Sequence, residues 1–145
     1  MMRRRILVAY DGSLLSRNAI QEAKWQAREE TNSEVHLISV MKATGPKTNA
    51  QISRNISNDL VEKFRPQMEM IKEEFERENI PVIVDILVEE DNENPGVKIC
   101  EYAENNQIDL IILGSRGLGN IKRIFLGSVS NNVVQNARCP VLVIK

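Results

Sequence analysis

Apolar runs without a charged residue alternate along this chain with stretches whose apolar residues recur at helical spacing. The runs Ile6–Tyr10 and Val141–Ile144 are apolar at every position, which is typical of strands covered on both faces. The pattern predicts strands at 4–10, 34–41, 81–88, 109–113 and 140–145 and helices at 14–30, 56–79, 95–106 and 128–137. Because strands and helices alternate, we expect an α/β fold of the three-layer sandwich type, with a five-stranded parallel sheet.

The predicted helix 56–79 carries an apolar stripe that continues through a proline. The stripe consists of Leu60, Phe64, Met68, Ile71 and Phe75. Its spacing predicts one helix kinked at Pro66, although a proline inside a helix costs about 3 kcal/mol. We interpret the stripe as core. The polar residues 42–55 contain the breaker Gly45–Pro46, so we expect them to form the longest irregular and mobile stretch.

A segment rich in glycine and serine follows the apolar run 108–112. Its glycines are spaced Gly114-x2-Gly117-x9-Gly127, and Ser128 opens the predicted helix 128–137. Glycine removes Cβ where a backbone turns with positive φ or approaches a ligand closely. The N–H groups of such a turn and of a helix N-terminus favour an anion. The segment therefore predicts a phosphate-binding site.

This spacing resembles the ATP-binding signature of the universal stress protein family, in the branch that binds ATP. The resemblance continues at 6–13, which is similar to the family's first strand and acidic turn, at 34–40, its second strand, and at 139–145, its C-terminal strand. It implies a single nucleotide-binding domain over residues 1–145, a strand order of 3-2-1-4-5, and ATP whose Mg²⁺ is held mainly by the phosphates. Near the end of the third strand the family usually has a glycine, where this chain has Glu89.

The implied strand order brings the ends of the first and fourth strands together, which is where ligands bind in open parallel sheets. Asp11 then faces Gly114, and by resemblance its carboxylate meets the ribose or adenine side of the nucleotide. The alternative is a turn or helix-cap residue, and both roles are compatible. Val40 lines the family's adenine pocket through its backbone, and Ala9 is small enough for a ring to approach. We interpret both side chains as core, with the backbone of Val40 contacting the base.

The start of the helix 128–137 is the predicted phosphate end of the site. Its residues are Gly127, Ser128, Val129 and Ser130. Serine also caps helices, so a cap without a ligand is the alternative; the glycines at the family's spacing favour the phosphate. Arg116, Lys122 and Arg123 are candidate charge partners, and Arg116 is preferred because it lies between Gly114 and Gly117.

Several kinds of site are excluded or disfavoured by the sequence. Asn120 follows Gly119 where a Walker P-loop requires lysine, and Lys122 stands where a dinucleotide motif requires its third glycine. No HExxH or GxSxG motif occurs. His36 is interpreted as a strand residue with its hydrogen bonds satisfied, and Cys100 and Cys139 as structural thiols. The acidic stretch 89–94 is interpreted as a solvated loop, because it lacks the ligand spacing of an EF-hand.

The net charge and the lengths of the apolar runs limit the classes of partner that we expect for this chain. A net charge of -1 and a pI near 5.9 give no general attraction to nucleic acid or to an anionic membrane. No run approaches the roughly 20 apolar residues of a membrane span, and no signal peptide is recognised, so we expect a cytoplasmic protein.

The leading functional hypothesis is an ATP-binding regulatory module of the stress response that acts as a nucleotide-dependent homodimer. A slow ATPase or self-phosphorylating enzyme using the same pocket is an alternative, although no catalytic base is evident and we expect no catalytic residue. A nucleotide-free dimeric scaffold is another. The dimer is expected at the last strand, which lies at a sheet edge in the implied order and is apolar on both faces. Its residues are Val141, Leu142, Val143 and Ile144.

Overall fold

The computed structural model describes residues 3–43, 50–116 and 126–145 of the chain, with side chains from residue 58 onward in the second of these ranges. The strands are β1 (Arg4–Ala9), β2 (Ser33–Lys42), β3 (Val82–Glu89), β4 (Leu110–Gly114) and β5 (Val141–Ile144). The helices are α1 (Leu14–Glu29), α2 (Ala50–Arg77), α3 (Pro95–Asn105) and α4 (Ser128–Asn136). Eight of the nine predicted elements match these bounds within about two residues.

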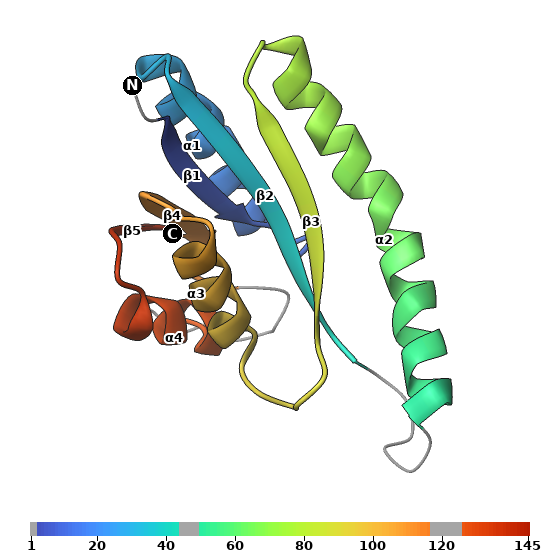
Figure 1. Ribbon diagram of the computed structural model, residues 1–145. Coiled ribbons are helices and arrows are strands. Elements are labelled where there is room, and N and C mark those ends of the chain that lie inside the picture. The colour runs from blue at the N-terminus through green and yellow to red at the C-terminus, as the bar shows by residue number, and fades with distance from the viewer. Residues whose placement is uncertain (1–2, 44–49, 117–125) are drawn as a thin grey trace.

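All five strands are parallel and follow the order β3-β2-β1-β4-β5. α1 and α2 pack on one face of the sheet, and α3 and α4 on the other (Figure 1). The predicted α/β fold and strand order are therefore confirmed.

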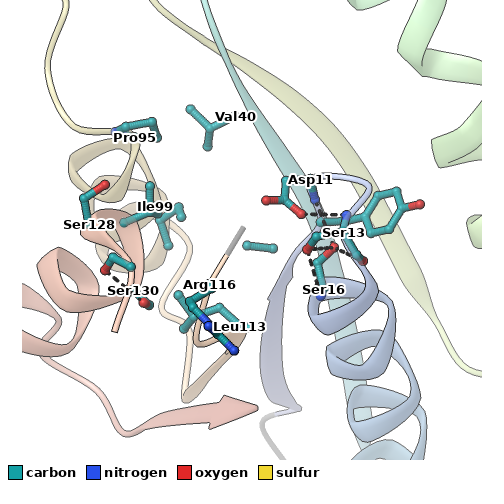
Figure 2. Close-up of a pocket in the computed structure, with 15 residues that line it drawn as sticks. Asp11, Ser13, Ser16, Val40, Pro95, Ile99, Leu113, Arg116, Ser128 and Ser130 are labelled. Atoms are coloured by element: carbon teal, nitrogen blue, oxygen red, sulfur yellow. Dashed lines mark hydrogen bonds between the residues drawn. The ribbon is translucent and has the colours of Figure 1, made fainter. Parts of the chain in front are cut away.

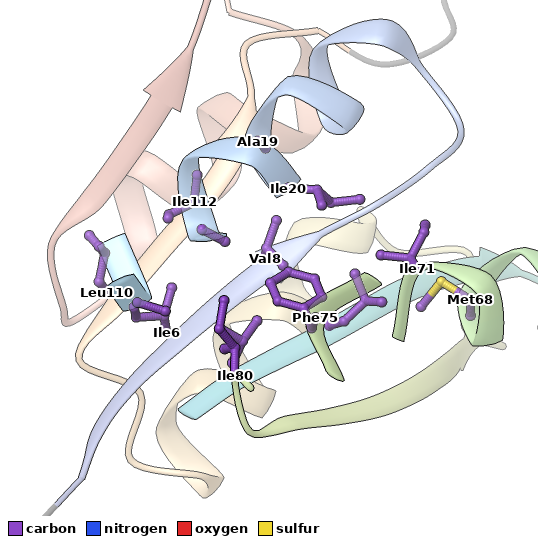
Figure 3. Close-up of a cluster of buried hydrophobic side chains, with 14 residues drawn as sticks. Ile6, Val8, Ala19, Ile20, Met68, Ile71, Phe75, Ile80, Leu110 and Ile112 are labelled. Carbon is purple, nitrogen blue, oxygen red and sulfur yellow. The ribbon is translucent and has the colours of Figure 1, made fainter. Parts of the chain in front are cut away.

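Two hydrophobic cores lie on opposite faces of the sheet, because successive side chains of a strand alternate between faces. Ile6 and Val8 of β1 contact the α1 and α2 side, whereas Leu7 between them contacts the α3 and α4 side. Phe75 of α2 is fully buried in the first core (Figure 3). Met68 and Ile71 lie in the same core, as the apolar stripe predicts.

The second helix is longer than the sequence pattern predicts. α2 is one helix with Pro66 inside it, as expected, but it begins at Ala50 and not at residue 56. The prediction of an irregular stretch over 42–55 is therefore wrong at both ends, because Lys42 still belongs to β2. A polar composition does not prevent a helix from extending, since each added residue gains a hydrogen bond once the helix exists. Residues 44–49, where we expect mobility, lie outside the described residues.

An ion-pair network fastens α1 to α2. The Glu74 carboxylate of α2 accepts hydrogen bonds from Arg17 and Lys24 of α1, both at 2.9 Å. The hydrogen bond from Arg17, and then that from Lys24, lower the pKa of Glu74 to about 2, against the opposing effect of burial. The Lys24 side chain is buried, and its ammonium lies 5.7 Å from the centre of the Phe75 ring. The two helices are thus held together by charge above the apolar core.

His36 has the structural role that the sequence predicts, and the two cysteines are partly buried. The buried His36 ring lies 2.7 Å from the Tyr102 hydroxyl at Nδ1 and 2.8 Å from Glu34 at Nε2. Cys100 and Cys139 are free thiols, and burial raises the pKa of both. Within the described ranges, no helix is both long and apolar enough to cross a membrane.

Candidate functional site

A pocket of about 340 Å³ opens at the carboxyl ends of β1 and β4. These strands pair with each other at the point where the winding of the sheet reverses, which is where α/β proteins bind ligands. The pocket brings together the candidate residues that the structure describes; Gly117, Lys122 and Arg123 lie outside the described residues. Those in its lining are Ala9, Asp11, Val40, Gly114, Arg116, Gly127, Ser128, Val129 and Ser130.

At one end of the pocket, β2 continues past the end of β1, so the backbone of Val40 lies beyond β1. The Tyr10 N–H donates to the Ile38 carbonyl at 2.9 Å and continues the bonding between β1 and β2 one residue beyond Ala9. Residues of a parallel strand turn their N–H and C=O alternately to one neighbour and to the other. The Ile38 carbonyl faces β1, and the Ala43 N–H faces β3, where it donates to the Glu89 carbonyl. Val40 is two residues from Ile38, so its backbone groups face the same side as those of Ile38. Its N–H and C=O thus face the space beyond β1.

Asp11 is both a turn residue and a pocket residue. One carboxylate oxygen, Oδ1, accepts the Ser13 N–H at 2.9 Å, which shapes the turn after β1. Gly12 in this turn has a φ of +88°, a conformation that favours glycine. The other carboxylate oxygen of Asp11 points into the pocket (Figure 2). The two roles that the sequence offers for Asp11 are therefore compatible.

The first turns of three helices border the pocket, and two of them are capped. In α1, the Ser13 hydroxyl oxygen accepts the Ser16 N–H at 3.2 Å. In α3, the Asn94 side-chain oxygen accepts the Gly96 N–H at 2.8 Å. These caps satisfy N–H groups that would otherwise be available to an anion.

The first turn of α4 has no side-chain cap. Its N-cap is Gly127, whose own N–H donates to the Ser115 carbonyl at 2.6 Å. The Ser130 hydroxyl also donates to this carbonyl, at 2.7 Å, and so is engaged within the protein. The backbone N–H groups of Ser128, Val129 and Ser130 remain without a partner among the residues that the structure describes. With the positive end of the helix dipole, they are donors of the kind that bind an anion.

The described glycines of the segment do not have the positive φ that we considered for them. Among the described residues, Gly12 is the glycine with positive φ. A Cβ on Gly114 would lie 2.8 Å from the Leu15 Cβ, so this glycine allows α1 to pack closely on the end of β4. A Cβ on Gly127 would lie no closer than 3.4 Å to another atom of the protein. Packing thus explains Gly114 but leaves Gly127 unexplained.

Of the three candidate charge partners of a phosphate, Arg116 is among the described residues. Arg116 lines the pocket. Lys122 and Arg123 lie outside the described residues. Across the described ranges, no three His, Cys, Asp or Glu side chains gather as metal ligands do.

The acidic stretch 89–94 is a solvated loop only in part, so that prediction needs correction. Asp91 is exposed, but the Glu89 side chain is buried and one of its oxygens accepts the Asp91 N–H at 2.7 Å. Asn94 belongs to the cap of α3. The stretch therefore shapes the connection between β3 and α3.

Sequence reasoning missed the part of the lining that comes from α3 and from the flanks of the predicted motifs. These residues are Tyr10, Ser13, Ser16, Pro95, Ile99 and Leu113. Ser13 and Leu113 adjoin motifs that the sequence identifies. Pro95 and Ile99 lie one helical turn apart on α3, and their pattern indicates only a helix with a buried face.

Comparison with known proteins agrees with this architecture. The sequence profile of the universal stress protein family matches residues 2–145. Universal stress protein MJ0531 of Methanocaldococcus jannaschii is 32% identical over 145 residues, which cover 98% of this chain and 82% of that protein. The solved structure of MJ0577, described there as a hypothetical protein, superposes with a TM-score of 0.88 at 33% identity and covers 100% of this chain and 97% of that one.

A more distant solved structure contains a nucleotide. The universal stress protein of Archaeoglobus fulgidus in complex with dAMP has a TM-score of 0.70 at 22% identity, with 100% of both chains covered. The profile match extends over almost the whole chain and coincides with the observed fold. The chain belongs to the universal stress protein family.

Proposed function

We propose that this protein is a cytoplasmic ATP-binding regulatory module of the stress response and that it acts as a homodimer. The observation that carries the proposal is the uncapped first turn of α4, which presents the N–H groups of Ser128, Val129 and Ser130 beside the pocket. Phosphate groups are ligands that such N–H donors favour.

The opposite end of the pocket suits adenine. The Val40 C=O is matched to the amino group of adenine and the Val40 N–H to the adjacent ring nitrogen, which accepts a hydrogen bond. Guanine presents the reverse order of donor and acceptor at these positions, so GTP would leave both backbone groups unpaired. Ala9, Pro95 and Ile99 supply apolar lining for a ring.

Asp11 stands between these two ends. Its carboxylate oxygen that points into the pocket can accept hydrogen bonds from ribose hydroxyl groups (Figure 2). The described part of the lining contains no carboxylate other than that of Asp11, whereas the first turn of α4 offers N–H donors. This fits ATP that carries Mg²⁺ on its own phosphates, with the protein binding the phosphate oxygens.

Binding is favoured over phosphoryl transfer. Within its described part, the lining contains no lysine or histidine. Enzymes that transfer phosphoryl groups place cations and a base around the reacting phosphate; this lining offers Arg116 as a cation, and one oxygen of Asp11 is already engaged in the turn after β1. The complex of the Archaeoglobus fulgidus relative with dAMP supports an adenine nucleotide as the ligand class; the triphosphate and its regulatory use are our extension.

Replacement of Ser128 tests the phosphate site at the level of one backbone atom. Ser128→Pro removes the N–H of the first residue of α4, a position where proline fits a helix. The preceding Gly127 has φ -63° and ψ 165°, which proline accepts in its neighbour. We expect the affinity for ATP, measured by calorimetry, to fall by about tenfold or more, because hydrogen bonds to charged groups contribute about 1.5–3 kcal/mol.

Ser128→Ala is the matched control, because it keeps the N–H and removes only the hydroxyl group. It should bind ATP within about threefold of the wild type. GTP should bind the wild type more weakly than ATP does. Wild-type protein that binds no ATP, or a Ser128→Pro variant with unchanged affinity, would contradict the proposed site.

A further inference from the structure

The segment Asn94-Pro95-Gly96 joins the first turns of α3 and α4. The Asn94 side chain has two roles: its oxygen caps α3 at the Gly96 N–H, at 2.8 Å, and its amide nitrogen donates to the Ser128 carbonyl at 3.2 Å. The second bond crosses from α3 to the first turn of α4. Asn94 therefore makes a direct polar connection between these two helix starts.

Close packing beside this bond brings the same two turns together. A Cβ on Gly96 would lie 2.8 Å from Oδ1 and 2.9 Å from Cβ of Asn132, and 3.0 Å from the Val129 carbonyl oxygen. Such distances are shorter than a real side chain allows, so Gly96 lets the backbone of α3 lie against α4. The contact is independent of the hydrogen bond from Asn94, and both fix the same relation between the two helices.

The connection matters because both turns line the pocket. Pro95 and Ile99 of α3 lie beside Ser128 of α4 on the same side of the pocket, across from Asp11 (Figure 2). α4 has only nine residues and no side-chain cap of its own. Its first turn is therefore held from outside, by the Ser115 carbonyl on one side and by Asn94 on the other.

We propose that Asn94 is a positioning residue of the nucleotide site, which holds the first turn of α4 so that its N–H groups meet the phosphates. The proposal rests on the proposed function, since it concerns the same pocket. The Asn94 side chain itself need not touch the nucleotide. Its removal should weaken binding of the phosphates and leave binding of the base intact.

Asn94→Ser separates the two bonds of this side chain. Serine is a good N-cap, so α3 keeps its cap, but the short hydroxyl group loses the donor to Ser128. We expect the affinity for ATP to fall about threefold to tenfold, the range that corresponds to the net worth of one hydrogen bond. The affinity for adenosine, which has no phosphate, should stay within about twofold of the wild type. Calorimetry with both ligands measures this difference.

Asn136→Ser is the matched control. Asn136 also donates its side-chain amide to a backbone carbonyl of α4, that of Asn132 at 2.9 Å, but at the far end of the helix. This variant should bind ATP like the wild type. Equal losses for ATP and adenosine in Asn94→Ser, or no loss for either, would overturn the proposal.

A measurement without nucleotide separates this proposal from the proposed function. The Asn131 N–H donates to the Gly127 carbonyl at 2.9 Å and reports the order of the first turn of α4. Its hydrogen exchange should be faster in Asn94→Ser than in the wild type or Asn136→Ser. If the wild type binds no ATP, the proposed function fails. Unchanged exchange at Asn131 would overturn the positioning role by itself.

Discussion

Single residues of one glycine pattern serve different physical purposes in this protein. Gly114 removes a clash with Leu15 of α1, whereas Gly127 has room for a Cβ in the folded chain. Both glycines belong to the family signature, but their contacts differ. Gly114 is a packing residue, and Gly127 is a candidate ligand residue.

The two alanine variants should therefore behave in opposite ways. We expect Gly114→Ala to lower the free energy of unfolding by about 1–3 kcal/mol, because the added methyl group would meet the Leu15 Cβ at 2.8 Å and backbone atoms of Leu15 and Ser16 at 3.1 and 3.2 Å. Gly127→Ala should lower it by only about 0.5–1 kcal/mol, the cost of alanine at an N-cap, but should weaken ATP binding. Urea unfolding and calorimetry on both variants measure the two effects. Equal destabilisation by the two substitutions would refute the distinction.

At the scale of elements, the attachment of α1 to α2 depends on charge and should depend on pH. The Glu74 carboxylate has a pKa of about 2 in the folded protein, mainly because Arg17 donates hydrogen bonds to it, against an ordinary value of 4.5. A carboxylate with a lowered pKa stabilises the fold at pH values above its unfolded pKa. This contribution is lost as the pH falls from about 4.5 toward about 2.

Glu74→Gln tests this dependence. The variant should lower the free energy of unfolding by about 1–2 kcal/mol at pH 7, because it removes the charge that Arg17 and Lys24 stabilise. The effect is smaller than the full pKa shift would give, because solvent reaches the ion pair and weakens it. The difference from the wild type should shrink toward pH 2. Urea unfolding across this range measures it, with the exposed Glu76→Gln on the same helix as the control. A difference that stays constant with pH would show that charge is not what Glu74 contributes.

The helices and strands also show which features of the structure could be predicted from the sequence. The strands and helices follow from apolar patterns, because burial on one or both faces leaves a period in the sequence. The start of α2 does not follow from such a pattern, because its polar residues are compatible with either an exposed helix or a loop. The pocket residues after β1 and β4 follow from motifs, whereas Ile99 needs the packing of α3, which is a long-range property. The role of Gly114 is missed for the same reason, because Leu15 is distant in sequence.

At the scale of the whole molecule, the edge strand β5 carries the prediction of a dimer. It pairs with β4 on one side, and its residues Val141–Ile144 are all half-buried. A charge-free apolar strand at an edge exposes both its backbone groups and its side chains to other chains. Pairing with a second copy around a two-fold axis would satisfy this edge and close the assembly.

Val143→Lys should convert this dimer into a monomer. Sedimentation at micromolar concentration should give twice the chain mass of 16.5 kDa for the wild type and that mass for the variant. Ile83→Lys, an exposed position on the other edge strand β3, is the control and should remain dimeric. A monomeric wild type, or a dimeric Val143→Lys, would place the interface elsewhere or remove it.

The two bonds received by the Ser115 carbonyl also bear on how this chain tolerates insertions. The Gly127 N–H and the Ser130 hydroxyl group join the residues that flank 117–125 at 2.6 and 2.7 Å. The entropy of closing a loop grows only slowly with its length, so each doubling costs about 0.6 kcal/mol. Since the ends are joined by the folded framework, an engineered insertion between them should leave α4 in place at little cost in stability. The fixed spacing of the glycines in the family's signature is therefore expected to serve the ligand and not the stability of the fold.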